Sequence, residues 1–212
     1  MSEFSEEREG KLSIVATPIG NMGDMTFRGL WNLKEANVIY AEDTRVISKL
    51  LAHYGVRTSV QRLDAATEGK KAKEVVARIE AGDHVVFVSD AGTPGISDPG
   101  ARLVAYVREH APEIVIDAVP GASSLTAALS IAGVVGDAFT FLGFLPHKKG
   151  RQTAIKKIAE REHTIVLFES PHRIEKLLAE LAKGGVVKVT IAREITKLHE
   201  EGVTGEPSEI AT

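Results

Sequence analysis

Short apolar runs alternate with segments of helical periodicity along almost the whole chain, and this alternation limits the fold more than any other feature. Short apolar runs are typical of buried strands, whereas apolar residues three and four positions apart indicate helices. Strands that alternate with helices pair in parallel and are covered by those helices. The sequence therefore predicts an α/β fold with mainly parallel central sheets. The expected strands are residues 12–16, 38–41, 84–88, 113–119, 138–144, 164–169 and 186–192, with 198–204 as a further candidate.

Helices are expected between these runs. The clearest covers residues 67–81, where apolar residues keep helical spacing and Gly82 follows as a stop signal. The segment 122–133 consists of small and apolar residues, which predicts a helix buried on most sides. The other expected helices are residues 25–36, the segment around Val46 to Leu51, a segment ending near His110, residues 150–162, and the segment around Ile174 to Leu181.

The 212 residues suffice for one large α/β domain or two small ones, and the most natural boundary lies near Pro120-Gly121. We expect a frayed polar tail over residues 1–10, an N-terminal α/β domain over 11–119 and a C-terminal α/β domain over 120–212. Because no low-complexity linker joins them, the two domains are expected to pack closely.

The composition excludes several classes of protein. The chain has no cysteine, which removes disulfides, thiolate metal sites and cysteine nucleophiles, and which fits a cytoplasmic protein. No apolar run approaches the ~20 residues that a membrane span needs, and the polar N-terminus lacks the apolar core of a signal peptide. The net charge of −3 gives no general basic field, so contact with nucleic acid requires a local basic patch.

The unusual residues follow the expected strands, where ligands bind in open α/β sheets. The conventional dinucleotide and P-loop fingerprints are missing. In the loop "VSDAGTPGISDPG", Gly92 allows close approach of the backbone to a ligand, and Asp90 is a candidate acceptor for ligand hydroxyl or amino groups. Asp98 is read as a helix cap together with Ser97, in preference to a ligand contact.

The motifs "VATPIGN", "AEDTR", "VSDAGTPGISDPG", "VPGASS", "GFLP", "ESPHR" and "ARE.TK" occur in that order. Together they resemble the bacterial 16S rRNA cytidine 2′-O-ribose methyltransferases, of the tetrapyrrole-methylase superfamily, from about Leu12 to Gly205. The resemblance implies S-adenosylmethionine as methyl donor, 16S rRNA of the small ribosomal subunit as substrate, a homodimer, and a ligand cleft between two dissimilar α/β domains. Members of that family continue beyond the last residue here, so the chain is expected to be either naturally short or truncated.

The resemblance also implies which residues bind the donor. They follow the expected strands or begin the helix at 122–133, and the amides and hydroxyls at that helix start suit a carboxylate or hydroxyl. The implied donor-binding residues are Pro18, Ile19, Asp90, Ala91, Gly92, Thr93, Ser123, Ser124, Phe168 and Ala192.

Methyl transfer to a ribose hydroxyl needs alignment of donor and acceptor and removal of a weakly acidic proton. The candidate proton acceptors are carboxylates with an arginine nearby in sequence: Glu42, Asp43, Glu169 and Glu194. Asp43 with Arg45, and Glu169, are the expected catalytic residues, but such pairs also tie loops together without taking part in a reaction.

A basic stretch over residues 147–157 is the only local concentration of positive charge. Lys148, Lys149, Arg151 and, from "ESPHR", Arg173 are expected to bind RNA phosphates, and a merely solvated helix face is the alternative. The histidines lack metal-ligand spacing, so no metal is expected.

Two further functions stay open on the sequence alone. One keeps the fold and donor but methylates a tetrapyrrole or a protein side chain, and "EDTR" and "ESPHR" argue against it. The other is an RNA-binding assembly factor without turnover.

Overall fold

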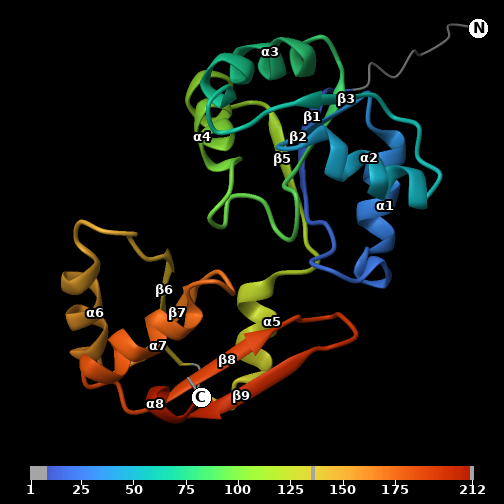
Figure 1. The fold of residues 1–212 in the computed structure, drawn as a ribbon. Helices are drawn as coiled ribbons and strands as arrows, with labels where there is room; N and C mark the ends of the chain where they lie inside the picture. The colour runs from blue at the N-terminus through green and yellow to red at the C-terminus, as the bar shows by residue number, and fades with distance from the viewer. Residues whose placement is uncertain (1–8, 135–136, 211–212) are drawn as a thin grey trace, which may run out of the picture. The chain divides into compact units, whose positions relative to one another are not determined.

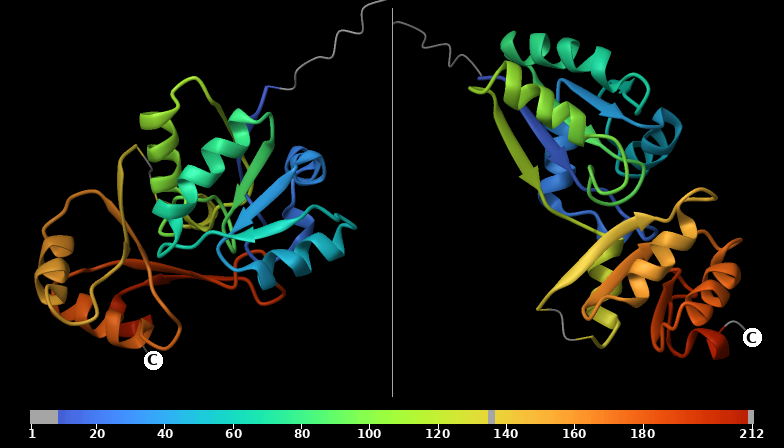
Figure 2. Two further views of the ribbon diagram at one scale, coloured as in Figure 1. Left: turned by 90° about the horizontal axis from the view of Figure 1, so that it is seen from above. Right: turned by 90° about the vertical axis from the view of Figure 1, so that its left-hand side faces the viewer.

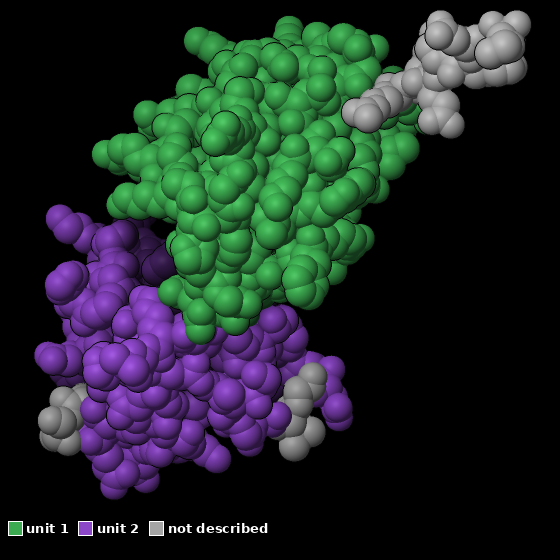
Figure 3. Space-filling view, turned by 90° about the vertical axis from the view of Figure 1, so that its right-hand side faces the viewer, with its two compact units in different colours: residues 1–123 green, residues 124–212 purple. Residues whose placement is uncertain are grey.

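The computed structural model describes residues 9–134 and 137–210. The chain divides into two compact units, residues 1–123 and 124–212, which are coloured separately in Figure 3. The sequence predicts a boundary between residues 119 and 120. Each unit is described below by itself.

Unit 1 is built on one sheet in which every pair of neighbouring strands is parallel (Figure 1). The strand order is β3-β2-β4-β1-β5, so β4 lies at the centre. The expected strands at 38–41 and 84–88 are confirmed with the same bounds. The five strands are β1 (Lys11–Val15), β2 (Val38–Ala41), β3 (Val60–Arg62), β4 (His84–Val88) and β5 (Val115–Val119).

Four α-helices cover the two faces of this sheet (Figures 1 and 2). The helices α1 (Phe27–Glu35) and α2 (Thr44–His53) pack on one face, and α3 (Glu68–Glu80) and α4 (Ala101–His110) pack on the other. The chain runs towards β3 through α1 and α2, then turns back towards β5 through α3 and α4. Right-handed crossovers in opposite directions place their helices on opposite faces.

The core of unit 1 explains the continuous apolar run of β4. Val85 and Phe87 pack with α3 and α4, whereas Val86 and Val88 pack with α1 and α2. Successive side chains of a strand point to opposite faces, so a strand covered on both sides needs apolar residues at every position.

The start of α4 differs from the expectation that Ser97 and Asp98 cap this helix. Its N-cap is Gly100, which has no side chain to cap the helix, and the Ser97-Asp98 cap is therefore wrong. Glu68, at the start of α3, replaces it: Oε1 accepts hydrogen bonds from the backbone N–H groups of Gly100 and Leu103, both at 2.9 Å. A cap supplied from another helix leaves no signal in the local sequence.

Unit 2 contains two separate two-stranded sheets. The strands β6 (Phe139–Phe144) and β7 (Thr164–Phe168) are parallel, whereas β8 (Val189–Arg193) and β9 (Glu201–Gly205) pair antiparallel and form the hairpin in red in Figure 1. The expectation of mainly parallel strands therefore does not extend to β8 and β9. Only residues 194–200 separate them, and these are too few for the crossover that parallel strands need.

The helices of unit 2 are α5 (Ser124–Ile131), α6 (Arg151–Ala159), α7 (Ile174–Lys183) and the short α8 (Pro207–Ile210). The apolar core forms around Ile155, Leu177 and Leu181, on α6 and α7. The expected burial of the helix at 122–133 is not found, since α5 has no fully buried residue. Within the described residues, no helix is long and apolar enough to cross a membrane.

Candidate functional site

The carboxyl ends of the five parallel strands of unit 1 meet at one edge of the sheet, and the unusual loops follow them there. β4 and its neighbour β1 lead to helices on opposite faces of the sheet. Such a reversal of strand order leaves a crevice outside the strand ends, where ligands of open α/β sheets bind. The candidate site therefore begins with the loops after β1 and β4.

These two loops are joined by their backbones. Thr17 and Gly92 exchange two hydrogen bonds, each of 3.0 Å, and the Thr17 hydroxyl donates to the carbonyl oxygen of Ser89 at 3.3 Å. Gly92 has a φ of +83°, and a Cβ there would lie 3.2 Å from Cγ2 of Ile19. Only glycine adopts this backbone conformation without strain while leaving room for Ile19.

The loop after β5 contacts the β4 loop. The Thr93 hydroxyl donates to the carbonyl oxygen of Ala122 at 3.1 Å, directly before Ser123. A Cβ on Gly92 would lie 3.6 Å from that same carbonyl oxygen. The structure thus brings together the expected donor-binding residues of unit 1: Pro18, Ile19, Asp90, Ala91, Gly92, Thr93 and Ser123.

The remaining expected donor-binding residues belong to unit 2. Ser124 is the first residue of α5. Phe168 ends β7, with its ring centroid 4.9 Å from that of Phe141, and Ala192 lies in β8.

The "EDTR" loop after β2 is tied to the β4 loop through Asp90, whose Oδ1 accepts a hydrogen bond from the backbone N–H of Asp43 at 3.0 Å. Asp43 is the N-cap of α2 and accepts from the backbone N–H of Arg45 at 2.8 Å. Its carboxylate also pairs with the Arg45 guanidinium at 2.5 Å, and these contacts hold the pKa of Asp43 well below its usual range. Asp43 therefore caps α2 and holds the Arg45 side chain in place, and its lowered pKa makes it a weak base.

Glu42 has the opposite electrostatic environment. Burial raises its pKa, and the neighbouring carboxylates of Asp90, Asp98, Asp64 and Asp43 raise it further. Within the described residues its carboxylate has no hydrogen bond or ion pair. A carboxylate with a raised pKa is a better proton acceptor than an ordinary one.

A cleft of about 330 Å³ opens at this edge, lined by Asp43, Thr44, Arg45 and Arg62. Arg62 ends β3 and pairs with Asp64 at 2.7 Å. Sequence reasoning missed Arg62 because β3 (Val-Gln-Arg) has one apolar residue, too few to indicate a strand.

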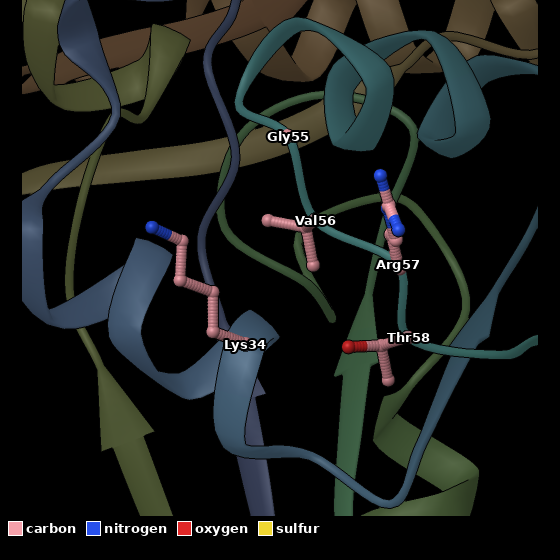
Figure 4. Close-up of a pocket in the computed structure, with 5 residues that line it drawn as sticks. All are labelled: Lys34, Gly55, Val56, Arg57 and Thr58. Atoms are coloured by element: carbon pink, nitrogen blue, oxygen red, sulfur yellow. The ribbon is translucent and has the colours of Figure 1, made fainter.

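A second cleft of unit 1, of about 380 Å³, lies elsewhere (Figure 4). Lys34 and Arg57 line it, together with Gly55, Val56 and Thr58. Lys34 precedes β2 and the other four residues precede β3, so this cleft lies at the amino ends of the strands. None of the motif loops contributes to it.

In unit 2, Glu169 is buried between two arginines, with 3% of its side chain exposed. Oε1 lies 2.7 Å from Nη2 of Arg173, and Oε2 lies 3.6 Å from Nη1 of Arg151. Arg151 also donates to Glu180 at 2.7 Å and is itself buried. These contacts turn the guanidinium of Arg151 into the protein, which weighs against the prediction that it binds RNA directly. They also favour the alternative that Glu169 ties loops together.

The other basic residues expected to bind RNA remain accessible. Lys148 and Lys149 are exposed, and neither forms an ion pair within the described residues. Arg173 is partly exposed and lies against the ring of His147, with Nη1 2.6 Å from Nδ1. Glu194 has a φ of +51° and pairs with Lys197 on the surface. No group of three or more His, Asp or Glu in residues 9–134 and 137–210 is arranged to hold a metal ion.

Comparison with known proteins gives the same picture of the fold. Solved structures superpose on nearly the whole chain, at sequence identities that show the fold alone. The methyltransferase CobJ matches with a TM-score of 0.70 at 20% identity, covering 94% of this chain and 87% of that one. The uroporphyrin-III C-methyl transferase of Thermus thermophilus, complexed with S-adenyl homocysteine, has a TM-score of 0.65 at 20% identity, with 95% and 90% covered.

Curated relatives are much closer in sequence. The "Ribosomal RNA small subunit methyltransferase I" of Synechocystis sp. is 44% identical over 91% of this chain and 69% of its own length. The protein of the same name from Thermotoga maritima is 42% identical, over 94% of this chain and 90% of its own length. The family model for tetrapyrrole (corrin/porphyrin) methylases matches residues 11–211. The chain therefore belongs to the tetrapyrrole methylase family.

Proposed function

We propose that this chain transfers the methyl group of S-adenosylmethionine to the ribose 2′-hydroxyl of a cytidine in 16S rRNA of the small ribosomal subunit. The observation that carries the proposal is the likeness to rRNA methyltransferases at 42% and 44% identity over more than nine-tenths of the chain. The solved methyltransferase that is named for uroporphyrin-III shares the fold at 20% identity, about half that value.

The joined loops of unit 1 fit the donor. Without a Cβ at Gly92, the backbone of this loop lies close to Ile19 and to the carbonyl oxygen of Ala122, and a glycine at this position lets a small ligand approach the backbone. The exposed carboxylate of Asp90 is available to accept from hydroxyl or amino groups. The carboxylates of Asp64 and Asp98 at the same edge favour a ligand that carries a cationic sulfonium. Ser123, Ser124, Phe168 and Ala192 are proposed to complete the donor site.

The chemistry required of the protein is alignment, exclusion of water and acceptance of one proton. We assign the proton acceptor to Glu42, because its pKa is raised and its carboxylate is not engaged within the described residues. Asp43 keeps a positioning role: it fixes Arg45, whose side chain is 87% exposed at the cleft. Arg45 is proposed to hold the substrate phosphate next to the reacting ribose.

Lys148, Lys149 and Arg173 are proposed to bind rRNA phosphates from unit 2, and the protein is proposed to work in the cytoplasm, where ribosomal subunits are found. We also propose a homodimer. Phe27 and Trp31 lie one turn apart on α1 and are 95% and 55% exposed, as expected of an apolar surface that contacts another protein chain.

An acceptor panel tests the proposal. The protein is incubated with labelled S-adenosylmethionine and, separately, with small ribosomal subunits that lack the modification, free 16S rRNA, a uroporphyrinogen and total protein. Transfer to subunits or to free 16S rRNA is expected. Labelling of the tetrapyrrole alone, or of protein alone, would show that this is the substrate and that rRNA is not. Donor binding without transfer would indicate an assembly factor.

A further inference from the structure

Arg151, the first residue of α6, keeps only 6% of its side chain exposed although it carries a full positive charge. Burying an ion pair costs hydration that an apolar residue of similar size would not lose, so this arrangement is weak evidence for stability. What arginine adds is a planar fork of N–H donors that reaches several partners at once. The partners of Arg151 therefore indicate its role.

Those partners come from three segments of unit 2. Nε donates to Oε2 of Glu180 on α7 at 2.7 Å, and Nη1 donates to the carbonyl oxygen of Pro146 at 3.3 Å. Nη1 also lies 3.6 Å from Glu169, directly after β7. The backbone N–H of Arg151 donates to the carbonyl oxygen of Lys148 at 3.2 Å. One residue thus holds the segment 146–150 at two of its carbonyl groups.

A second set of contacts, through Arg173, acts on the same segment. Glu169 pairs with Arg173, and Arg173 contacts the ring of His147. Leu145, directly before the segment, is buried in the apolar core of unit 2. The segment 146–150 is therefore fixed at both ends and in the middle, although it forms neither helix nor strand.

The segment carries Lys148 and Lys149, whose side chains point to solvent and form no ion pair within the described residues. Gly150, which ends it, has a φ of +86° and open space around it, so its own packing does not hold the backbone in place. Two neighbouring cations on a fixed backbone bind an anionic chain better than two on a mobile one, because less conformational entropy is lost on binding.

We propose that Arg151 is a positioning residue for the RNA substrate. It contacts no RNA itself, but fixes the segment 146–150 so that Lys148 and Lys149 are presented together to adjacent phosphate groups. The identity of the ligand rests on the proposed function. The contacts by which Arg151 fixes the segment 146–150, called the clamp below, are a property of the protein alone, so the two are tested separately.

The clamp is tested without RNA. Because the chain has no cysteine, K149C provides a single site for a nitroxide spin label. Adding R151K should make the label more mobile, since an ammonium group lacks the planar fork that reaches Glu180 and Pro146 together. R193Q, which removes an exposed ion pair with Glu201, is the matched control and should leave mobility unchanged. Equal mobility with and without R151K would overturn the proposal.

The consequence for binding is tested by a double-mutant cycle on small ribosomal subunits. K148A/K149A should weaken binding about tenfold at moderate salt, since two phosphate contacts are lost. In the R151K background the same two substitutions should weaken binding to the subunits less than about threefold, because the two lysines no longer act together. Equal losses in both backgrounds would contradict the proposal.

The affinity for S-adenosylmethionine separates positioning from folding. The thermal midpoint should fall in R151K, because buried hydrogen bonds to Glu180 and Pro146 are lost. Well below that midpoint, the affinity for S-adenosylmethionine should stay unchanged, whereas a general loss of folding would lower it along with RNA binding. If the unaltered protein bound no subunits, the proposed function would fail, and the spin-label result would still decide whether Arg151 fixes the segment.

Discussion

The carboxylate of Asp90 accepts a hydrogen bond from the backbone N–H of Asp43 at 3.0 Å. Asp90 follows β4 and Asp43 follows β2, so one side chain joins two neighbouring loops at the centre of the sheet. The backbone pair of Thr17 and Gly92 joins the β4 loop to the β1 loop on the other side. The three loops therefore form one framework, and a change in one residue is expected to displace the others.

Asp90→Ala should weaken binding of S-adenosylmethionine about tenfold or more, since it removes a donor contact and the link to Asp43 together. Isothermal calorimetry measures this directly. D117N is the matched control, because Asp117 pairs with Lys11 across two other strands. Donor affinity equal to that of the unaltered protein would remove Asp90 from the site.

Gly92→Val should abolish measurable donor binding. The φ of +83° strains any β-branched residue, and the new Cβ would lie 3.2 Å from Ile19. The free energy of unfolding should fall by roughly 1–3 kcal/mol, as measured by denaturant titration. At Gly69 a Cβ meets no atom within 4 Å, so G69A should be tolerated without loss of binding.

Glu42→Gln should reduce turnover about 100-fold or more, with the donor affinity unchanged, if Glu42 accepts the proton. Because the pKa of Glu42 is raised, the rate should decline with falling pH already above the ordinary glutamate range near ~4.3. Single-turnover transfer across pH measures both effects. E80Q, at the exposed end of α3, is the control, and a similar loss in it would argue against a specific role for Glu42.

Glu68→Ala should lower the free energy of unfolding by about 2–3 kcal/mol, because two backbone N–H groups at the start of α4 lose their buried acceptor. Glu68→Gln keeps an acceptor oxygen and should cost less. Urea unfolding of both variants gives the comparison. Equal losses would show that the charge, rather than the acceptor, caps the helix.

His84 should make stability depend on pH near neutrality. Burial lowers its pKa below the ordinary value of 6.5, and nearby Lys11 lowers it further. The unfolded chain then binds a proton near pH ~6.5 while the folded protein does not, so stability falls as pH drops through that value towards the folded pKa. H84Q should flatten this dependence between pH 7.5 and 5.5, and the exposed-site variant H53Q should retain it. An unchanged profile in H84Q would exclude His84 as the cause.

The order of strands and helices could be predicted in unit 1 because both faces of its sheet are covered. Burial on two sides leaves continuous apolar runs, as at residues 84–88, and their ends are easily recognised. β3 lies at the edge and has only Val60 as an apolar residue, so nothing in its composition separates it from a loop. The antiparallel pairing of β8 and β9 depends on the turn between them.

The site was predictable as a set of loops, since ligand positions follow the carboxyl ends of parallel strands. The roles of single charged residues were not, because they depend on partners distant in the sequence. Arg151 belongs to a basic stretch, which indicates an exposed cation, yet it is buried and pairs with Glu169 and Glu180. Asp98 resembles a cap, but Glu68 on another helix provides that contact.

The most direct measurement of the central claim is a methyl-transfer assay on small ribosomal subunits that lack the modification. The rRNA is digested to nucleosides after incubation with S-adenosylmethionine and analysed by mass spectrometry. We predict 2′-O-methylcytidine at close to one per subunit, lost with Gly92→Val and strongly reduced with Glu42→Gln. Methylation of a base, or of no nucleoside at all, with active protein and intact subunits would contradict the account.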